Sequence, residues 1–288
     1  MKRIRLISVG LMILISVGFS EENSNQKEFK EATKTAQFIE AHPFKGDESR
    51  KPKGNLVNLG DYGVDDFAYL AVPAQEPIGG VVLIHEWWGL NKHIKLTADD
   101  YAARGYVTIA VDLYNGTSTE DATQAGALMR ELNEKLALKT INAGVRFLKE
   151  SPRFKVGKVA SIGWCMGGGL SLQSALQIEK LDAAVMYYGP VETDQEKLEK
   201  LKIPLLGLFA TKDDWVKPAS VDEFEKKLTA LKKEYRFLRF DAAHAFANPS
   251  NANFKPEFAE QASKAVLAFL HQVFTNPTKK AGFFENLF

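Results

Sequence analysis

From residue 55 onwards, short apolar runs alternate along the chain with longer stretches of helical periodicity. Continuous apolar runs rich in Val, Ile and Leu are typical of strands buried on both faces, and a period near 3.6 is typical of helices. The predicted strands are 55–59, 67–72, 79–85, 107–113, 156–163, 183–188, 204–210 and 235–240. The predicted helices are 94–104, 120–150 with a break near Asn133 or Lys139, 166–178, 220–233 and 256–274.

The order of these elements indicates the fold class. The first two strands flank a Gly-Asp turn and are expected to form an antiparallel hairpin. The later strands alternate with helices, which predicts right-handed crossovers and an α/β fold: a mostly parallel central sheet with helices on both faces. Active sites of such sheets form beyond the carboxyl ends of the strands. The residues that follow each strand are therefore the candidates for chemistry.

The first twenty residues have a different pattern. Three basic residues within the first five positions precede an apolar run over 6–19, and Gly18 and Ser20 are small residues before a possible cleavage point. This pattern predicts a signal peptide over 1–20 and a periplasmic or secreted protein. No stable membrane association is expected after cleavage. A retained anchor is the alternative, although the run is short for a membrane span.

The remaining chain divides into three parts. Residues 21–53 are polar and charged and are interpreted as an N-terminal arm that packs on the domain, with a partly disordered linker as the alternative. Within the arm, 27–41 could form one helix. Residues 54–275 form the predicted α/β domain, and 276–288 are a loosely specified tail.

Composition excludes several classes of function. The chain has 288 residues, of which 45% are hydrophobic and 25% are charged, enough for one large α/β domain. The net charge of +1 offers no basic surface for nucleic acid. No His/Cys/Asp cluster has the spacing of metal ligands, and no Gly-x-Gly-x-x-Gly follows the first parallel strand, so neither a metal nor a dinucleotide cofactor is expected. A single cysteine excludes an intrachain disulfide.

That cysteine lies in the most informative stretch of the chain, Gly163-Trp164-Cys165-Met166-Gly167. A predicted strand leads into Gly-x-Cys-x-Gly and a predicted helix follows, which is the pattern of a nucleophile elbow with Cys in place of Ser. The glycines would avoid collisions in a strained turn. The sulfur would stand at a helix N-terminus, which favours a thiolate, and the next backbone N–H would face a developing oxyanion. The alternative is an inert buried cysteine.

Two further strand ends supply the partners that such a nucleophile needs. Asp213 follows strand 204–210, and His244 follows strand 235–240. The order nucleophile, acid, base is the order that α/β-hydrolases use. The imidazole would take the thiol proton, and the carboxylate would orient the ring and stabilise the imidazolium. Spacing alone leaves Asp214 as a competitor for the acid.

The other histidines have weaker prospects. His85 ends a buried strand beside the proposed site and could support it. His42 and His271 are interpreted as surface or packing residues, and His93 as a residue that flanks a helix.

Taken together, several segments resemble the dienelactone hydrolase family of α/β-hydrolases over about residues 55–274. They are 85–91, 105–114, 163–168, 184–189, 212–216 and 243–246. The resemblance implies an α/β-hydrolase fold and a carboxymethylenebutenolidase-like hydrolysis of carboxylic esters or lactones through an acyl-enzyme. It implies Cys165 as the nucleophile, His244 as the base and Asp213 as the acid. Val216, three residues after Asp213, matches the family pattern.

The resemblance also implies residues around the triad. Glu86 matches a glutamate that lies beside the cysteine and helps to control its proton. The backbone N–H groups of Trp87 and Met166 would form the oxyanion hole. Trp88 and Trp164 are expected to wall an apolar substrate pocket.

Two positions depart from the family's archetype, in which arginines bind the carboxylate of dienelactone. Gly116 and Asn248 stand there instead. An uncompensated carboxylate in an apolar pocket is costly, so dienelactone itself is not the expected substrate, and another small-molecule ester or lactone is. The alternatives are a small-molecule binding protein that has lost turnover and a thiol peroxidase. The lack of a resolving cysteine argues against the peroxidase.

Overall fold

The structure, a computed structural model, describes residues 23–42, 49–154 and 156–275. The predicted signal peptide (1–20) and tail (276–288) lie outside these residues and stay predictions, as does the location of the protein. None of the helices within the described ranges is long and apolar enough to cross a membrane.

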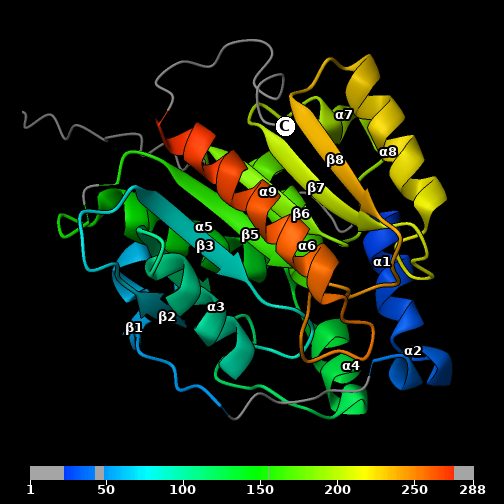
Figure 1. Cartoon of the computed structure of the whole chain (residues 1–288), viewed down its shortest axis with the longest axis horizontal. Coiled ribbons are helices and arrows are strands. Elements are labelled where there is room, and N and C mark those ends of the chain that lie inside the picture. Colours follow the sequence, from blue (N-terminus) through cyan, green and yellow to red (C-terminus); the bar gives the residue numbers. More distant parts are fainter. Residues whose placement is uncertain (1–22, 43–48, 155, 276–288) are drawn as a thin grey trace, which may run out of the picture.

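The described part of the chain folds around an eight-stranded sheet in the order β1-β2-β4-β3-β5-β6-β7-β8 (Figure 1). The strands are β1 (Asn55–Asn58), β2 (Phe67–Ala71), β3 (Gly79–Ile84), β4 (Tyr106–Val111), β5 (Val159–Trp164), β6 (Ala183–Tyr187), β7 (Leu205–Ala210) and β8 (Tyr235–Phe240). β1 and β2 form the predicted antiparallel hairpin, and β2 pairs antiparallel with β4. All pairs from β4 to β8 are parallel. The predicted mostly parallel sheet is confirmed.

Helices cover both faces of this sheet. They are α1 (Ser24–Ala32), α2 (Ala36–Glu40), α3 (Lys92–Ala102), α4 (Ala122–Glu131), α5 (Glu134–Glu150), α6 (Met166–Gln177), α7 (Gln195–Leu198), α8 (Pro218–Ala230) and α9 (Pro256–Thr275). Figure 1 shows α3 and α9 in front of the sheet and α5 and α6 behind it. Every residue of β3 to β7 is buried, as the continuous apolar runs predict.

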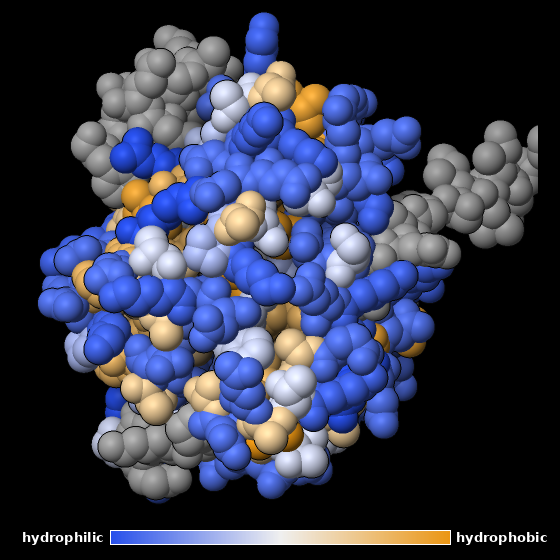
Figure 2. Space-filling model, turned by 90° about the vertical axis from the view of Figure 1, so that its right-hand side faces the viewer, coloured by the Kyte–Doolittle hydropathy of each residue, from blue (hydrophilic) through white to orange (hydrophobic). Residues whose placement is uncertain are grey.

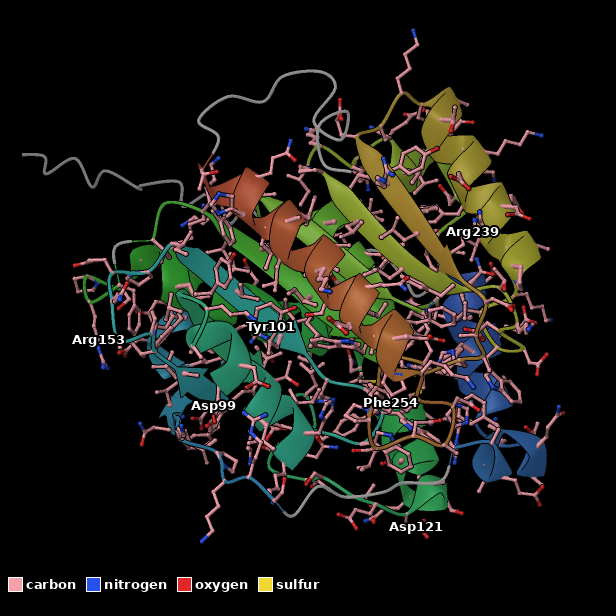
Figure 3. The ribbon with its side chains drawn as sticks, in the orientation of Figure 1. Asp99, Tyr101, Asp121, Arg153, Arg239 and Phe254 are labelled. Atoms are coloured by element: carbon pink, nitrogen blue, oxygen red, sulfur yellow. The ribbon has the colours of Figure 1, made fainter. Side chains whose placement is uncertain are left out.

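The break in the helical block 120–150 falls at Leu132–Asn133. The side chain of Asn133 accepts a hydrogen bond from the N–H of Leu136 at 3.2 Å and so begins α5 as its N-cap. Asp121, labelled in Figure 3, caps α4 in the same way at 2.7 Å from the N–H of Gln124. Of the two predicted break points, Asn133 is confirmed, and Lys139 lies inside α5.

The arm differs from its prediction. The single helix predicted over 27–41 is wrong, because the chain forms α1 and α2 with a break between them. At the break, the Thr35 hydroxyl accepts a hydrogen bond from the N–H of Phe38 at 3.2 Å and starts a new helix. Residues 23–42 pack on the domain, as predicted, and bury Phe29 and Phe38.

The edge of the sheet at β8 is more exposed than its centre. There Arg239, labelled in Figure 3, extends from β8 towards α8, and its guanidinium pairs with Asp222 at 2.9 Å and Glu225 at 2.6 Å. The sequence analysis missed α7 and a 3₁₀ turn, Gly60–Tyr62, because elements of three or four residues are too short for a period to show.

Candidate active site

The predicted elbow forms between β5 and α6. Cys165 has φ 55° and ψ −119°, in the half of conformational space that L-residues rarely adopt. A Cβ at Gly163 would lie 1.8 Å from the carbonyl oxygen of Gly167, and a Cβ at Gly167 would lie 2.3 Å from the carbonyl oxygen of Ile84. The backbone at both glycines is therefore packed too closely for any side chain, as the turn pattern predicts.

The imidazole of His244, after β8, donates from Nδ1 to Oδ2 of Asp213, after β7, at 2.8 Å, and both side chains are buried. Because the carboxylate accepts from Nδ1–H, Nε2 of a neutral ring is left as an acceptor. Oδ1 of Asp213 accepts from the N–H groups of Trp215 and Val216, each at 2.9 Å. Asp214 is exposed. The structure brings Asp213, and not its neighbour, to the histidine.

The thiol and the imidazole influence each other. Burial lowers the pKa of His244, but Asp213 and Cys165 outweigh this effect and raise it well above the ordinary value. Burial raises the pKa of Cys165, and His244 and the N–H of Met166 act in the opposite direction. The expected effect of the helix N-terminus is present, because the N–H of Met166 lowers the pKa of Cys165, but burial has the larger effect and the pKa of the thiol is raised.

Glu86 follows His85 at the end of β3 and lies beside Cys165 and His244. Its Oε2 accepts a hydrogen bond from Nδ2 of Asn248, and its Oε1 accepts one from the Tyr188 hydroxyl at 3.3 Å. Burial raises the pKa of Glu86 to about 7, against the opposing effects of His244, Asn248 and Tyr188. An amide therefore faces Glu86 at one position where the family's archetype has a cation. The negative charge of Glu86 in turn raises the pKa of Cys165.

His85 joins the ends of two strands behind the site. Its Nδ1–H donates to the carbonyl of Glu86 at 2.5 Å, and its Nε2 accepts from the N–H of Leu113 at 3.2 Å. Burial lowers the pKa of this histidine, which fits a neutral ring with one donor and one acceptor. His85 thus supports the backbone that carries Glu86, in line with the supporting role considered for it.

Of the two predicted oxyanion groups, the N–H of Met166 lies next to the thiol. The N–H of Met166 interacts with the sulfur of Cys165, and the sulfur of Met166 accepts from the Tyr114 hydroxyl at 3.2 Å. Trp87 is buried, and its ring contacts that of Trp88 at 4.7 Å between centroids. The oxyanion role of the two N–H groups stays a prediction.

The two predicted pocket-wall residues lie outside the triad. The ring of Trp88 packs against Trp87, and the ring of Trp164 stacks on Tyr187 at 5.4 Å. The ring contacts described for Trp88 and Trp164 are therefore with other aromatic residues. Their role in substrate binding stays a prediction.

Several side chains around His244 were missed by the sequence analysis. The rings of Tyr188, His42 and Phe29 lie 5.1, 5.5 and 5.7 Å from that of His244. Tyr188 directly follows β6, so the strand-end rule could have found it. His42 and Phe29 lie in the polar arm, where no local pattern indicates a site. Of the two interpretations of His42, surface or packing residue, packing is confirmed, because the residue is 2% exposed and stacks on Phe38.

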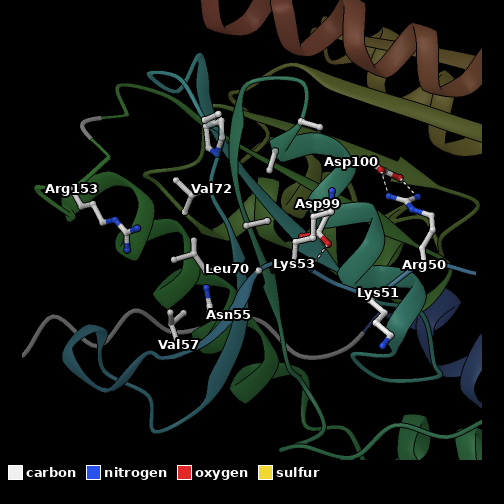
Figure 4. A pocket seen from close by; sticks show the side chains of 16 residues that line it. Arg50, Lys51, Lys53, Asn55, Val57, Leu70, Val72, Asp99, Asp100 and Arg153 are labelled. Atoms are coloured by element: carbon white, nitrogen blue, oxygen red, sulfur yellow. Dashed lines mark hydrogen bonds and ion pairs between the residues drawn. The ribbon is translucent and has the colours of Figure 1, made fainter. Parts of the chain in front are cut away.

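The site is closed to solvent. Cys165 is 2% exposed and His244 is 1% exposed. Two open hollows of the described surface, of about 890 and 580 Å³, are lined by other residues. The larger lies between the β1–β2 hairpin and α3, where Arg50 pairs with Asp100 at 2.5 Å (Figure 4).

Figure 2 shows the face that carries α1, α2 and α8, where hydrophilic residues predominate. Within the described ranges, no three His, Cys, Asp or Glu side chains are arranged to hold a metal ion.

A mostly parallel sheet with a strained strand-to-helix turn after β5 and a hydrogen-bonded Asp–His pair from the segments after β7 and β8 has the architecture of an α/β-hydrolase. A profile of the dienelactone hydrolase family matches residues 67–274. The chain therefore belongs to the dienelactone hydrolase family, whose members are hydrolases of carboxylic esters and lactones.

Two relatives agree with this assignment, and one solved structure shows the same fold. A putative carboxymethylenebutenolidase of Aquifex aeolicus is 32% identical over 68% of this chain and 87% of its own length. Protein usf of Aquifex pyrophilus is 32% identical over 77% of this chain and 100% of its own. The crystal structure of a putative dienelactone hydrolase from Klebsiella pneumoniae superposes with a TM-score of 0.67 at 24% identity, over 76% of this chain and 98% of the other.

We expect the contribution of Glu86 to the free energy of unfolding to fall as the pH rises from about 4.5 to 7. We expect Glu86→Gln to lack this pH dependence. The pKa of Glu86 is about 7 in the folded protein, against an ordinary value of 4.5, so the folded state holds a proton that the unfolded state releases in this range. The stabilisation is complete below pH 4.5 and is lost as the pH rises through 7. It amounts to something on the order of 3 kcal/mol. Urea unfolding of both proteins at pH 5 and pH 8 measures it.

The comparison with the variant is needed because His42 acts in the opposite direction. Burial and the charge of His244 lower the pKa of His42 to about 4, so its contribution grows as the pH rises from 4 to 6.5. The difference between wild type and Glu86→Gln isolates the glutamate. Equal changes in unfolding free energy in both proteins would contradict the prediction.

Proposed function

We propose that the protein hydrolyses uncharged carboxylic esters or lactones through a Cys165–His244–Asp213 triad and an acyl-enzyme. The observation that carries the proposal is the strained elbow that holds the thiol against the His244–Asp213 pair. Strain at a residue is expected where a function depends on its position. A buried cysteine kept only for packing would need no such turn.

The proposed reaction starts with transfer of the thiol proton to Nε2 of His244, which Asp213 favours by stabilising the imidazolium. The thiolate attacks the carbonyl carbon, and the oxyanion accepts hydrogen bonds from the N–H groups of Met166 and Trp87. The leaving alcohol takes the proton from His244 and the thioester remains. Water then attacks the thioester with His244 as the base.

Glu86 is proposed to control the charge of the thiol. Its carboxylate disfavours a second negative charge nearby, so it keeps the resting sulfur protonated. With a pKa of about 7, Glu86 can also hold a proton itself. The thiolate then forms when substrate is present and remains protected otherwise.

The preference for uncharged substrates follows from the charges of the site. Gly116 and Asn248 stand where the family's archetype has arginines, and no lysine or arginine is among the buried residues of the described chain. Glu86 adds a buried carboxylate beside the sulfur. A substrate carboxylate would lose its hydration and meet no cation, which is unfavourable.

A matched pair of substrates tests this preference. We expect kcat/KM for p-nitrophenyl butyrate to exceed that for p-nitrophenyl hemisuccinate by about a hundredfold, the effect of one uncompensated buried charge of roughly 3 kcal/mol. Asn248→Arg, which places a cation beside Glu86, is expected to narrow the ratio. Equal rates for the two esters would show that the site accepts anions, and hydrolysis of neither would contradict the proposed activity.

A further inference from the structure

The first twenty described residues, 23–42, lie against the proposed catalytic centre although they are far from it in the sequence. Figure 1 shows α1 beside the end of β8 and the start of α8. Phe29 of α1 contacts the ring of His244 at 5.7 Å. Phe38 of α2 contacts the rings of Trp87 at 5.0 Å and Trp215 at 4.6 Å. We call residues 23–42 the N-terminal lid, because they cover the triad from this side.

Polar bonds hold the lid at its margins. Asn25 donates to the carbonyl of Val191 at 2.9 Å, and Lys30 donates to the carbonyl of Leu132 at 3.1 Å. Arg130 donates to the hydroxyl of Thr33 at 2.9 Å. The thiol is buried when the lid is in place, so part of the structure must move before a substrate can reach the sulfur.

His42, at the end of the lid, has a fixed orientation. Its ring stacks on Phe38 at 4.1 Å, and its Nδ1–H donates to the carbonyl of Phe38 at 2.6 Å. Because a carbonyl can only accept, Nε2 of the neutral ring carries the lone pair. Burial, and next the charge of His244, lower the pKa of His42 to about 4, so it is neutral at physiological pH.

This lone pair is buried and has no partner among the described residues. An unsatisfied buried acceptor is unfavourable and calls for an explanation. Nε2 of His244 is likewise buried without a hydrogen bond of good geometry; in the resting site it interacts with the Cys165 thiol, and in the proposed acyl-enzyme that sulfur no longer carries a proton. The two rings are neighbours, 5.5 Å apart between centroids, and one water molecule that donated a hydrogen bond to each nitrogen would satisfy both acceptors. Two acceptors match the two protons of a water.

We propose that His42 is a catalytic residue: its Nε2 accepts a hydrogen bond from the water that hydrolyses the acyl-enzyme, beside the Nε2 of His244 that deprotonates this water. The inference rests on the proposed acyl-enzyme. The water oxygen bonds to the carbonyl carbon while one proton moves to His244. The C–S bond breaks, and the leaving thiolate of Cys165 takes that proton back. The second proton stays on the product acid, held by His42.

This role of His42 predicts an effect on hydrolysis of the acyl-enzyme and not on its formation. We expect His42→Phe, which keeps the ring stack and removes the acceptor, to form the acyl-enzyme from p-nitrophenyl acetate at a rate within about threefold of wild type. Its acyl-enzyme should decay about tenfold more slowly, as fits the loss of one hydrogen bond. Intact mass of quenched samples follows both steps. Hydroxylamine, which attacks thioesters without a base, should restore decay.

Two further variants provide controls. His42→Gln retains an acceptor and should decay nearly as fast as wild type. His271→Phe, at an exposed position of α9, should leave both steps unchanged. Wild-type decay in His42→Phe, an equal slowing of both steps, or a slow His42→Gln would overturn the role of His42 while the hydrolase assignment stands. A wild type that forms no acyl-enzyme would overturn the proposed function and this role together.

Discussion

Replacement of Cys165 by alanine is expected to lower kcat/KM for p-nitrophenyl butyrate by about 10⁴-fold or more, the effect of removing a covalent nucleophile. The variant should form no acyl-enzyme detectable by intact mass. The chain has one cysteine, so no second thiol can take over the attack. The backbone N–H groups and the triad histidine would remain, and they account for a residual rate above that in water.

A second substitution at the same position separates chemistry from folding. Cys165→Ser keeps a nucleophilic atom in the elbow and should retain more activity than Cys165→Ala. Both variants should unfold at nearly the wild-type temperature, because each changes a few atoms of one side chain. Unchanged hydrolysis by the alanine variant would exclude Cys165 as the nucleophile.

Asp213→Asn is expected to reduce kcat/KM by about 10³- to 10⁴-fold, as in other triads that lose the carboxylate. Oδ2 accepts from Nδ1–H of His244 and Oδ1 accepts from the N–H groups of Trp215 and Val216. An asparagine has only one oxygen for these two tasks. Its amide would either donate towards the backbone N–H groups or favour the wrong tautomer of the imidazole.

Asp214→Asn is the matched control, because Asp214 is adjacent, chemically identical and exposed. It should leave kcat/KM within about twofold, as expected for a surface change away from the site. Steady-state kinetics on the two variants and wild type decide between the acids. A larger loss in Asp214→Asn than in Asp213→Asn would reverse the assignment.

The catalytic domain could be predicted from the sequence because its signals are local. Each central strand has its own apolar run. Cys165 directly follows β5, and Asp213 and His244 lie three and four residues after the ends of β7 and β8. In a parallel sheet the carboxyl ends of the strands meet at one edge, so strand order in the sequence already places these residues near one another. Glu86 required the family resemblance, since a glutamate at a strand end is more often a surface residue.

The lid could not be predicted in the same way. Phe29, Phe38 and His42 lie among charged residues, and their partners, Trp215 and His244, come about two hundred positions later. The environment of these residues depends on long-range tertiary contacts, which the hydrophobic pattern of residues 23–42 does not indicate. The raised pKa of Cys165 could not be predicted either, because burial of the thiol is a property of the folded site.

Because the site is closed, the reactivity of its buried thiol reports how often the folded protein opens. Its one sulfhydryl is 2% exposed, so a chromogenic disulfide or an alkylating label can reach it only in moments of opening. When reclosure is fast, labelling proceeds at the reagent's intrinsic speed multiplied by the fraction of molecules that stand open. The labelling rate of Cys165 in the wild-type protein thus gives the fraction of molecules with an open site, and no engineered label is needed.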